Sequence, residues 1–271
     1  MAGIGEPSLI VDGAGSPHTY SLKPSQARAV EQADMVVWIG HELEAFLEKL
    51  IETLGANARV LELAETDGLV RLKLREGGAF EGHGHEETAE ADDGHGHDEF
   101  DMHLWLDPRN AAVMTRRIAE ALAETDPANA ERYRANGEAT IGRLDELTAE
   151  LDDMLAPVRN RPFVVFHDAY HYFENRFGLS AAGSITVSPD VMPGAERIAA
   201  LRAKVRETGA ACAFSEPQFE PKLVAVVTEG TDARAGVLDP LGADIEPGGE
   251  LYFELMRRLA ASVRDCLAEA S

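Results

Sequence analysis

The chain has 271 residues, of which 45% are hydrophobic, and this is enough for one large globular domain or two smaller ones. Its 48 acidic and 25 basic residues give a formal net charge of −23, which argues against nucleic acid or an anionic membrane as a partner. The charge suits a cationic ligand, although solubility alone would account for it. Its apolar runs fall short of the ~20 residues that a membrane-spanning helix needs.

Short apolar runs alternate with helical patterns in the first part of the chain. Pro24 begins one helix, because a residue without an N–H loses nothing in the first helical turn. This alternation predicts a parallel α/β sheet. We expect strands at Ser8–Val11, Met35–Ile39 and Arg59–Leu63, and helices at about Pro24–Ala33 and Leu43–Leu54.

The stretch 81–101 is acidic and rich in histidine, and it contains no Lys or Arg. With so little apolar surface it cannot form a packed core, so we expect a mobile surface loop. Imidazole and carboxylate both bind divalent cations, and we interpret the stretch as a metal-collecting loop. The alternative is a solvated acidic insertion with incidental histidines. Its four histidines form two His-Gly-His pairs: His83, His85, His95 and His97.

Two Asp-Pro pairs mark helix starts after this loop. Asp107 is suited to cap a helix that runs to about Ala123, and Asp126 precedes a longer one. Apolar and small residues recur at three- and four-residue spacing from Ala128 to about Leu155, which gives a helix ~42 Å long at 1.5 Å per residue. We expect the segment 127–157 to join an N-terminal lobe, 1–126, to a C-terminal lobe, 158–271.

The C-terminal lobe repeats the alternation of strands and helices. We expect strands at Phe163–Phe166, Ala211–Ser215 and Gly236–Leu238. We expect helices at about Ala169–Phe177, from just after Pro193-Gly194 to about Glu207, at Pro221–Glu229 and at Leu251–Ala268.

Polar residues that follow strands are the candidate ligands, because open parallel sheets bind ligands at the carboxyl ends of their strands. His18, His41, His167, Glu216 and Asp239 hold such positions. Another histidine, at position 103, stands just before a helix. Any one of these histidines taken alone is more simply a capping or core residue.

A zinc-type donor set can be drawn from these candidates. It consists of the imidazoles of His18, His103 and His167, with Asp239 as a fourth ligand. Glu216 could accept a hydrogen bond from the N–H of one of these imidazoles without itself binding the metal.

A metallopeptidase reading centres on His167 and His171, which are four residues apart. That motif needs both histidines on one helix and a glutamate after the first. Here Asp168 follows the first histidine, which we place at a strand end. The spacing therefore gives little support for a peptidase.

The two cysteines, Cys212 and Cys266, are too few for a cysteine-based zinc site. They are either two buried thiols or one disulfide, and their number alone favours thiols. The first five residues lack the basic and apolar regions of a signal peptide, which by itself favours a cytosolic chain.

Taken together, the motifs resemble the zinc-binding components of high-affinity zinc ABC importers (ZnuA-type), which belong to the metal-specific solute-binding proteins of cluster A-I. The resemblance covers nearly the whole chain. The motifs are, in order, SPHTYSLKPSQ, ADMVVWIG-x-E-x-E-x-F, the acidic His-rich insertion, MHLWLDP, FVVFHDAYHYF, SEPQF and LDPLG.

The resemblance implies two α/β lobes with parallel sheets flanked by helices, joined by one long rigid helix. It implies that His18, His103 and His167 bind Zn²⁺ in the cleft between the lobes, with Asp239 a less certain fourth ligand. It also implies a disulfide between Cys212 and Cys266, and therefore an oxidising compartment, the periplasm. Histidine at position 167 favours zinc over manganese.

One feature departs from the family. Its members begin with a signal peptide, a first strand and a helix, whereas this chain starts inside that region. We therefore expect an N-terminally truncated chain, shortened by design or by a misplaced start codon.

The function implied is capture of zinc and its delivery to the membrane permease of an ABC transporter, by a non-enzymatic and monomeric protein. Because neutral imidazoles are the ligands, affinity should fall below about pH 6.5. A zinc-buffering metallochaperone is the alternative, and a metallohydrolase is a weaker one.

Overall fold

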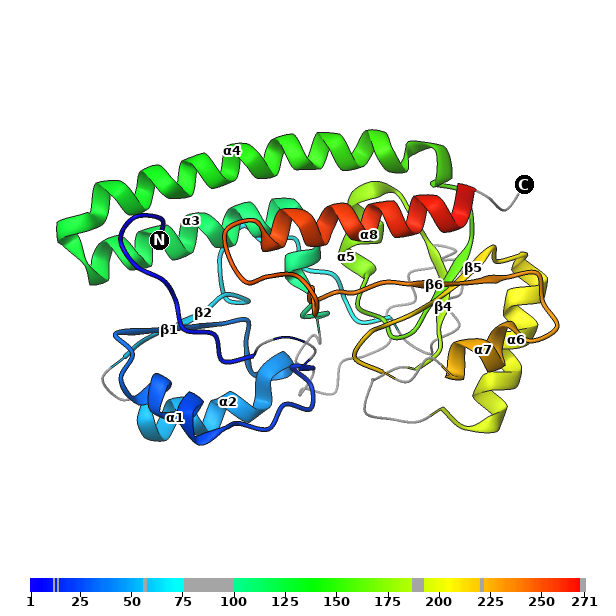
Figure 1. The fold of residues 1–271 in the computed structure, drawn as a ribbon, viewed down its shortest axis with the longest axis horizontal. Helices are drawn as coiled ribbons and strands as arrows, with labels where there is room; N and C mark the ends of the chain where they lie inside the picture. The colour runs from blue at the N-terminus through cyan, green and yellow to red at the C-terminus, as the bar shows by residue number, and fades with distance from the viewer. Residues whose placement is uncertain are drawn as a thin grey trace, which may run out of the picture. The chain divides into compact units, whose positions relative to one another are not determined.

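The computed structural model describes residues 1–11, 13, 15–55, 58–75, 100–186, 193–219 and 222–268 (Figure 1). His83, His85, His95 and His97 lie outside these residues, so the predicted metal-collecting loop is not described. The chain forms two compact units. Unit 1 comprises Met1–Val70, Leu104–Met154 and Asp239–Ala261, and unit 2 comprises Arg71–His103, Leu155–Leu238 and Ser262–Ser271.

Unit 1 contains a small parallel sheet with two described strands. β1 (Met35–Trp38) pairs in parallel with β2 (Arg59–Glu62), as the alternation predicted. Helix α1 (Pro24–Glu31) precedes β1, and α2 (His41–Leu54) connects the two strands. The prediction of a strand at Ser8–Val11 was wrong. The segment bends at Ile10 and Val11 and has no strand partner among the described residues. Leu9 is 50% exposed, so the apolar run is only partly buried.

Both Asp-Pro helix starts in unit 1 are confirmed. The Asp107 carboxylate accepts a hydrogen bond from the Arg109 N–H and caps α3 (Pro108–Thr125). Pro127 opens a short 3₁₀ turn, η2 (Pro127–Asn129), which leads directly into α4 (Ala130–Leu155). The chain passes from unit 1 into unit 2 at the last residue of this long helix. A second 3₁₀ turn, η1 (Leu104–Leu106), precedes α3.

Helix α4 lies beside the first part of α8 (Leu251–Ala268) within unit 1 (Figure 1). A stripe of fully buried leucines, Leu144, Leu147 and Leu151, gives α4 its apolar face. Arg257 of α8 makes a bidentate ion pair with Glu150 of α4, with N–O distances between 2.8 and 3.0 Å. The three- and four-residue spacing of the sequence therefore gives this helix one buried face.

Unit 2 is built on a four-stranded parallel sheet of order β4-β3-β5-β6. The strands β3 (Phe163–Val165), β5 (Cys212–Ser215) and β6 (Arg234–Val237) confirm the prediction. The strand β4 (Ala181–Ser184) was not predicted, because Ala-Ala-Gly-Ser contains none of the branched or aromatic residues that favour strands. The helices of this unit are α5 (His171–Phe177), α6 (Ala195–Thr208) and α7 (Lys222–Thr228), with a 3₁₀ turn, η3 (Ala156–Val158), before β3.

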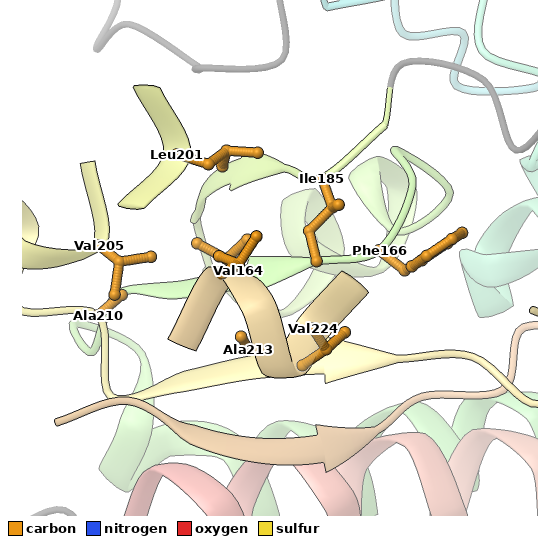
Figure 2. Packing of buried hydrophobic residues seen from close by; sticks show 9 residues of the cluster. Val164, Phe166, Ile185, Leu201, Val205, Ala210, Ala213 and Val224 are labelled. Atoms are coloured by element: carbon orange, nitrogen blue, oxygen red, sulfur yellow. The ribbon is translucent and has the colours of Figure 1, made fainter. Parts of the chain in front are cut away.

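Alternate residues of the central strands pack on opposite faces of the unit 2 sheet. Val164 and Ala213 face α6 and α7, where they meet Leu201, Val205 and Val224 (Figure 2). On the neighbouring positions, Phe163 and Phe214 make an edge-to-face contact with ring centroids 5.8 Å apart. Nearly continuous apolar runs such as Phe-Val-Val-Phe are therefore needed because both faces of the sheet are buried.

A disulfide joins Cys212 of β5 to Cys266 near the end of α8. The preference for free thiols drawn from the cysteine count was therefore wrong, and the pairing implied by the family resemblance is confirmed. Among the described residues, no helix is long and apolar enough to cross a membrane.

Replacing both Cys212 and Cys266 with serine should lower the free energy of unfolding by about 2–4 kcal/mol. The crosslink closes a loop of 54 residues, and its loss lets the unfolded chain gain entropy. Urea unfolding of wild type and variant, each with and without dithiothreitol, measures this. The reductant should affect the wild type alone, and an unchanged wild-type midpoint in reductant would contradict the prediction.

Candidate metal centre

His167 stands at the carboxyl end of β3, two residues past the last residue of the strand. Its Nδ1 lies 2.7 Å from Oε1 of Glu216, the first residue after the neighbouring strand β5. Both side chains are buried. Since parallel strands end at the same edge of the sheet, the carboxylate and the imidazole meet there, as their strand-end positions predicted.

His103 is held in the same way by a carboxylate close to it in the sequence. Its Nδ1 lies 2.7 Å from Asp101 Oδ1, which also accepts a hydrogen bond from the His103 backbone N–H at 3.0 Å. Asp101 is almost completely buried. This pair of bonds fixes both the backbone and the ring of His103 relative to one carboxylate oxygen.

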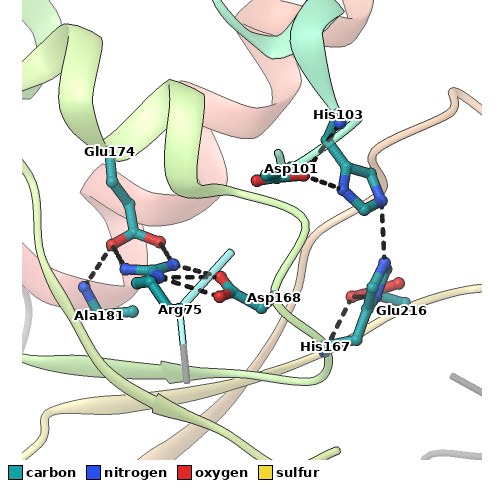
Figure 3. A network of polar contacts seen from close by, with 8 residues as sticks. All are labelled: Arg75, Asp101, His103, His167, Asp168, Glu174, Ala181 and Glu216. Atoms are coloured by element: carbon teal, nitrogen blue, oxygen red, sulfur yellow. Dashed lines mark hydrogen bonds and ion pairs between the residues drawn. The ribbon is translucent and has the colours of Figure 1, made fainter. Parts of the chain in front are cut away.

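The two rings point their Nε2 atoms at each other, 3.4 Å apart (Figure 3). A carboxylate only accepts hydrogen bonds, so the Nδ1 of each ring carries the proton. In the neutral imidazoles both Nε2 atoms then present lone pairs, and these repel unless a cation lies between them. Each histidine is thus in the tautomer that a metal ligand needs.

The separation of the nitrogens fits one metal ion in particular. Zinc binds imidazole nitrogen at about 2.0–2.1 Å in tetrahedral geometry, so two such ligands lie about 3.3 Å apart. The distance of 3.4 Å between the Nε2 atoms of His103 and His167 matches this value. The residues therefore fit two of the ligands of a tetrahedral ion.

The surroundings of the two rings are negatively charged. Burial by itself lowers the pKa of His103 and is the largest single influence on it. The charge and hydrogen bond of Asp101, with the charges of Glu216 and Asp168, together outweigh burial, so the pKa lies above its usual value. Arg75 compensates part of this charge, with its guanidinium bound to both Asp168 and Glu174. These two carboxylates, with Asp101 and Glu216, outnumber the one guanidinium, which favours a bound cation.

The other two predicted ligands, His18 and Asp239, belong to unit 1. His18 lies in unit 1 after the buried Pro17 and is itself half-buried. Asp239, also in unit 1, accepts three backbone hydrogen bonds: from Leu241 and Gly242 at 3.0 Å each and from Ala243 at 2.6 Å. The Asp239 carboxylate thus caps the turn that follows it.

His41 and His171 both begin helices. His41 is the exposed first residue of α2 and lies 3.1 Å from Glu48. His171 is the first residue of α5, whereas His167 precedes that helix, so the two histidines do not share a helix face as a metallopeptidase requires.

Two residues that organise the site were not identified from the sequence. Asp101 was counted among the acids of the loop, although its position two residues before His103 was a usable signal. No sequence signal pointed to Arg75, because its partner Asp168 is 93 residues away in the chain.

Comparison with known proteins agrees with these features. Residues 3–266 match the family described as "Zinc-uptake complex component A periplasmic" (ZnuA). The chain is 50% identical to "High-affinity zinc uptake system protein ZnuA" of Brucella suis, over 99% of this chain and 87% of the relative. It is 37% identical to the protein of the same name from Yersinia pestis, over 96% and 83%.

Solved structures give the same result. A crystal structure of ZnuA matches with a TM-score of 0.77 at 27% identity, covering 97% of this chain and 90% of that one. A zinc-bound deletion mutant of ZnuA matches with a TM-score of 0.75, also at 27% identity, over 96% and 88%. On the family match over nearly its whole length and on these identities, the chain belongs to the ZnuA family of periplasmic zinc-uptake proteins.

Proposed function

We propose that this protein captures Zn²⁺ in the periplasm and delivers it to the membrane permease of an ABC transporter for zinc import. The observation that carries the proposal is the His103–His167 pair, with Nε2 atoms 3.4 Å apart and a carboxylate behind each ring. Membership of the zinc-uptake family and the names of its relatives support the transport role.

The proposed ligands are His103 and His167 together with His18. Three imidazoles are a donor set typical of zinc, and the segment SPHTYSL around His18 is one of the motifs by which the chain resembles its family. Asp239 is the proposed fourth ligand, but it would have to give up some of its bonds to the backbone N–H groups of the following turn to bind a metal.

The role we assign to the site is binding without catalysis. Asp101 and Glu216 hold the imidazoles with Nε2 toward the ion, so neither ring has to turn before it binds. We propose a monomer that binds no nucleic acid, since the net charge of −23 repels phosphate backbones. The lobe limits near residues 126 and 158 stay a prediction.

His167→Ala should abolish the tight zinc site. Losing a direct ligand should cost more than the 10- to 100-fold, in order of magnitude, that is typical of a lost outer partner. Calorimetric titration with Zn²⁺ and metal analysis of the purified protein measure this, and His41→Ala is the control because that histidine is exposed at a helix start. Tight binding of one zinc ion by the His167 variant would refute the assignment.

Deleting residues 81–99 should leave one tight zinc site and remove weaker ones. The four histidines of this stretch supply accessory ligands, whereas Asp101 and His103 lie beyond its end. Stoichiometry and affinity from calorimetry separate the two classes of site. If the tight site disappeared with the deletion, the division between accessory and principal ligands would be wrong.

A further inference from the structure

Tyr172, on α5, is fully buried and its hydroxyl bonds to two backbone groups. The oxygen accepts a hydrogen bond from the Leu72 N–H at 3.0 Å, and the hydroxyl donates one to the Asp101 C=O at 2.8 Å. Those two residues are also bonded to each other, since the Asp101 N–H donates to the Leu72 C=O at 2.9 Å. Three hydrogen bonds thus form a closed ring through Leu72, Asp101 and Tyr172.

The ring is extended by one further contact along the chain. Lys73 and Phe100, the neighbours of Leu72 and Asp101, form an antiparallel bridge. The backbone of Asp101 is therefore held from one side by a strand-like pairing and from the other by the Tyr172 hydroxyl. The position of a residue tied in this way is defined by its backbone as well as by its side chain.

Asp101 is also the residue whose carboxylate holds the Nδ1 and the backbone N–H of His103. A shift of the Asp101 backbone would move this carboxylate and with it the His103 ring. Tyr172 itself lies five residues after His167, on the helix that the chain enters from that ligand. One hydroxyl therefore connects the segments that carry both histidines.

We propose that Tyr172 is a positioning residue of the metal site. Its hydroxyl sets the separation of the His103 and His167 nitrogens through Asp101, and so slows the loss of the bound ion. This inference rests on the proposed zinc-binding function. Ligands already at the distance that zinc requires lose little entropy on binding, and displacing one of them weakens the site.

Tyr172→Phe tests the hydroxyl alone, because the ring keeps its place in the core. Tyr133→Phe is the matched control, since Tyr133 is also buried but donates its hydroxyl to Asp126 in unit 1. Zinc dissociation into excess chelator should be about 10-fold faster for Tyr172→Phe, as for other outer partners of metal ligands. It should be unchanged for Tyr133→Phe, and equal rates for Tyr172→Phe and wild type would overturn the proposal.

Combining the change with Asp101→Asn distinguishes positioning from general stabilisation. If Tyr172 acts through Asp101, adding Tyr172→Phe to Asp101→Asn should accelerate dissociation by no more than about twofold. If the two effects multiply, Tyr172 acts by another route and the proposal fails. The proposed function fails separately, through absence of tight zinc binding by the wild-type protein.

A measurement on the wild-type protein does not depend on whether the variants fold. Zinc binding should slow hydrogen exchange of the Leu72 and Asp101 amides, which belong to the ring. The Arg234 amide, bonded to the Ala211 C=O at the start of β6, is the internal control and should not change. Unaltered exchange at Leu72 and Asp101 would overturn the proposal.

Discussion

The candidate metal centre depends on one constraint: the Nε2 atoms of His103 and His167 face each other 3.4 Å apart. Each ring is prevented from turning away by a carboxylate at its Nδ1, from Asp101 for His103 and from Glu216 for His167. The carboxylates also place the proton of each neutral ring on Nδ1, so that the lone pairs of the two Nε2 atoms face each other. Two facing lone pairs repel each other, and a cation bound between them removes this repulsion, so the arrangement favours binding of a cation.

The remainder of unit 2 supplies the geometry of this constraint. β3 and β5 are neighbours in the sheet, so the residues that follow them, His167 and Glu216, meet without any long connection. Apolar side chains cover one face of these strands through α6 and α7, and the disulfide ties the other face to α8. The edge of the sheet thus carries His167, while the short segment from Asp101 to His103 carries the second imidazole.

The parts of this architecture that depend on local pattern could be predicted from the sequence. Strand-end polarity identified His167 and Glu216, and the Asp-Pro pairs identified two helix starts. The segment Ala181–Ser184 was missed because only pairing with β3 makes it a strand, and Ser8–Val11 was overestimated because an apolar run does not require burial. Arg75 and Tyr172 act on partners 71 to 100 residues away, which no local pattern records.

The ring formed by Leu72, Asp101 and Tyr172 has a consequence for how such a protein can evolve. The pairing closes the chain at residues that flank the stretch 76–99, so that stretch can gain or lose residues without changing the connection between its ends. The entropic cost of a longer loop grows slowly, by about 0.6 kcal/mol for each doubling of its length. Insertions of different length and composition between residues 76 and 99 can therefore be tolerated without moving His103.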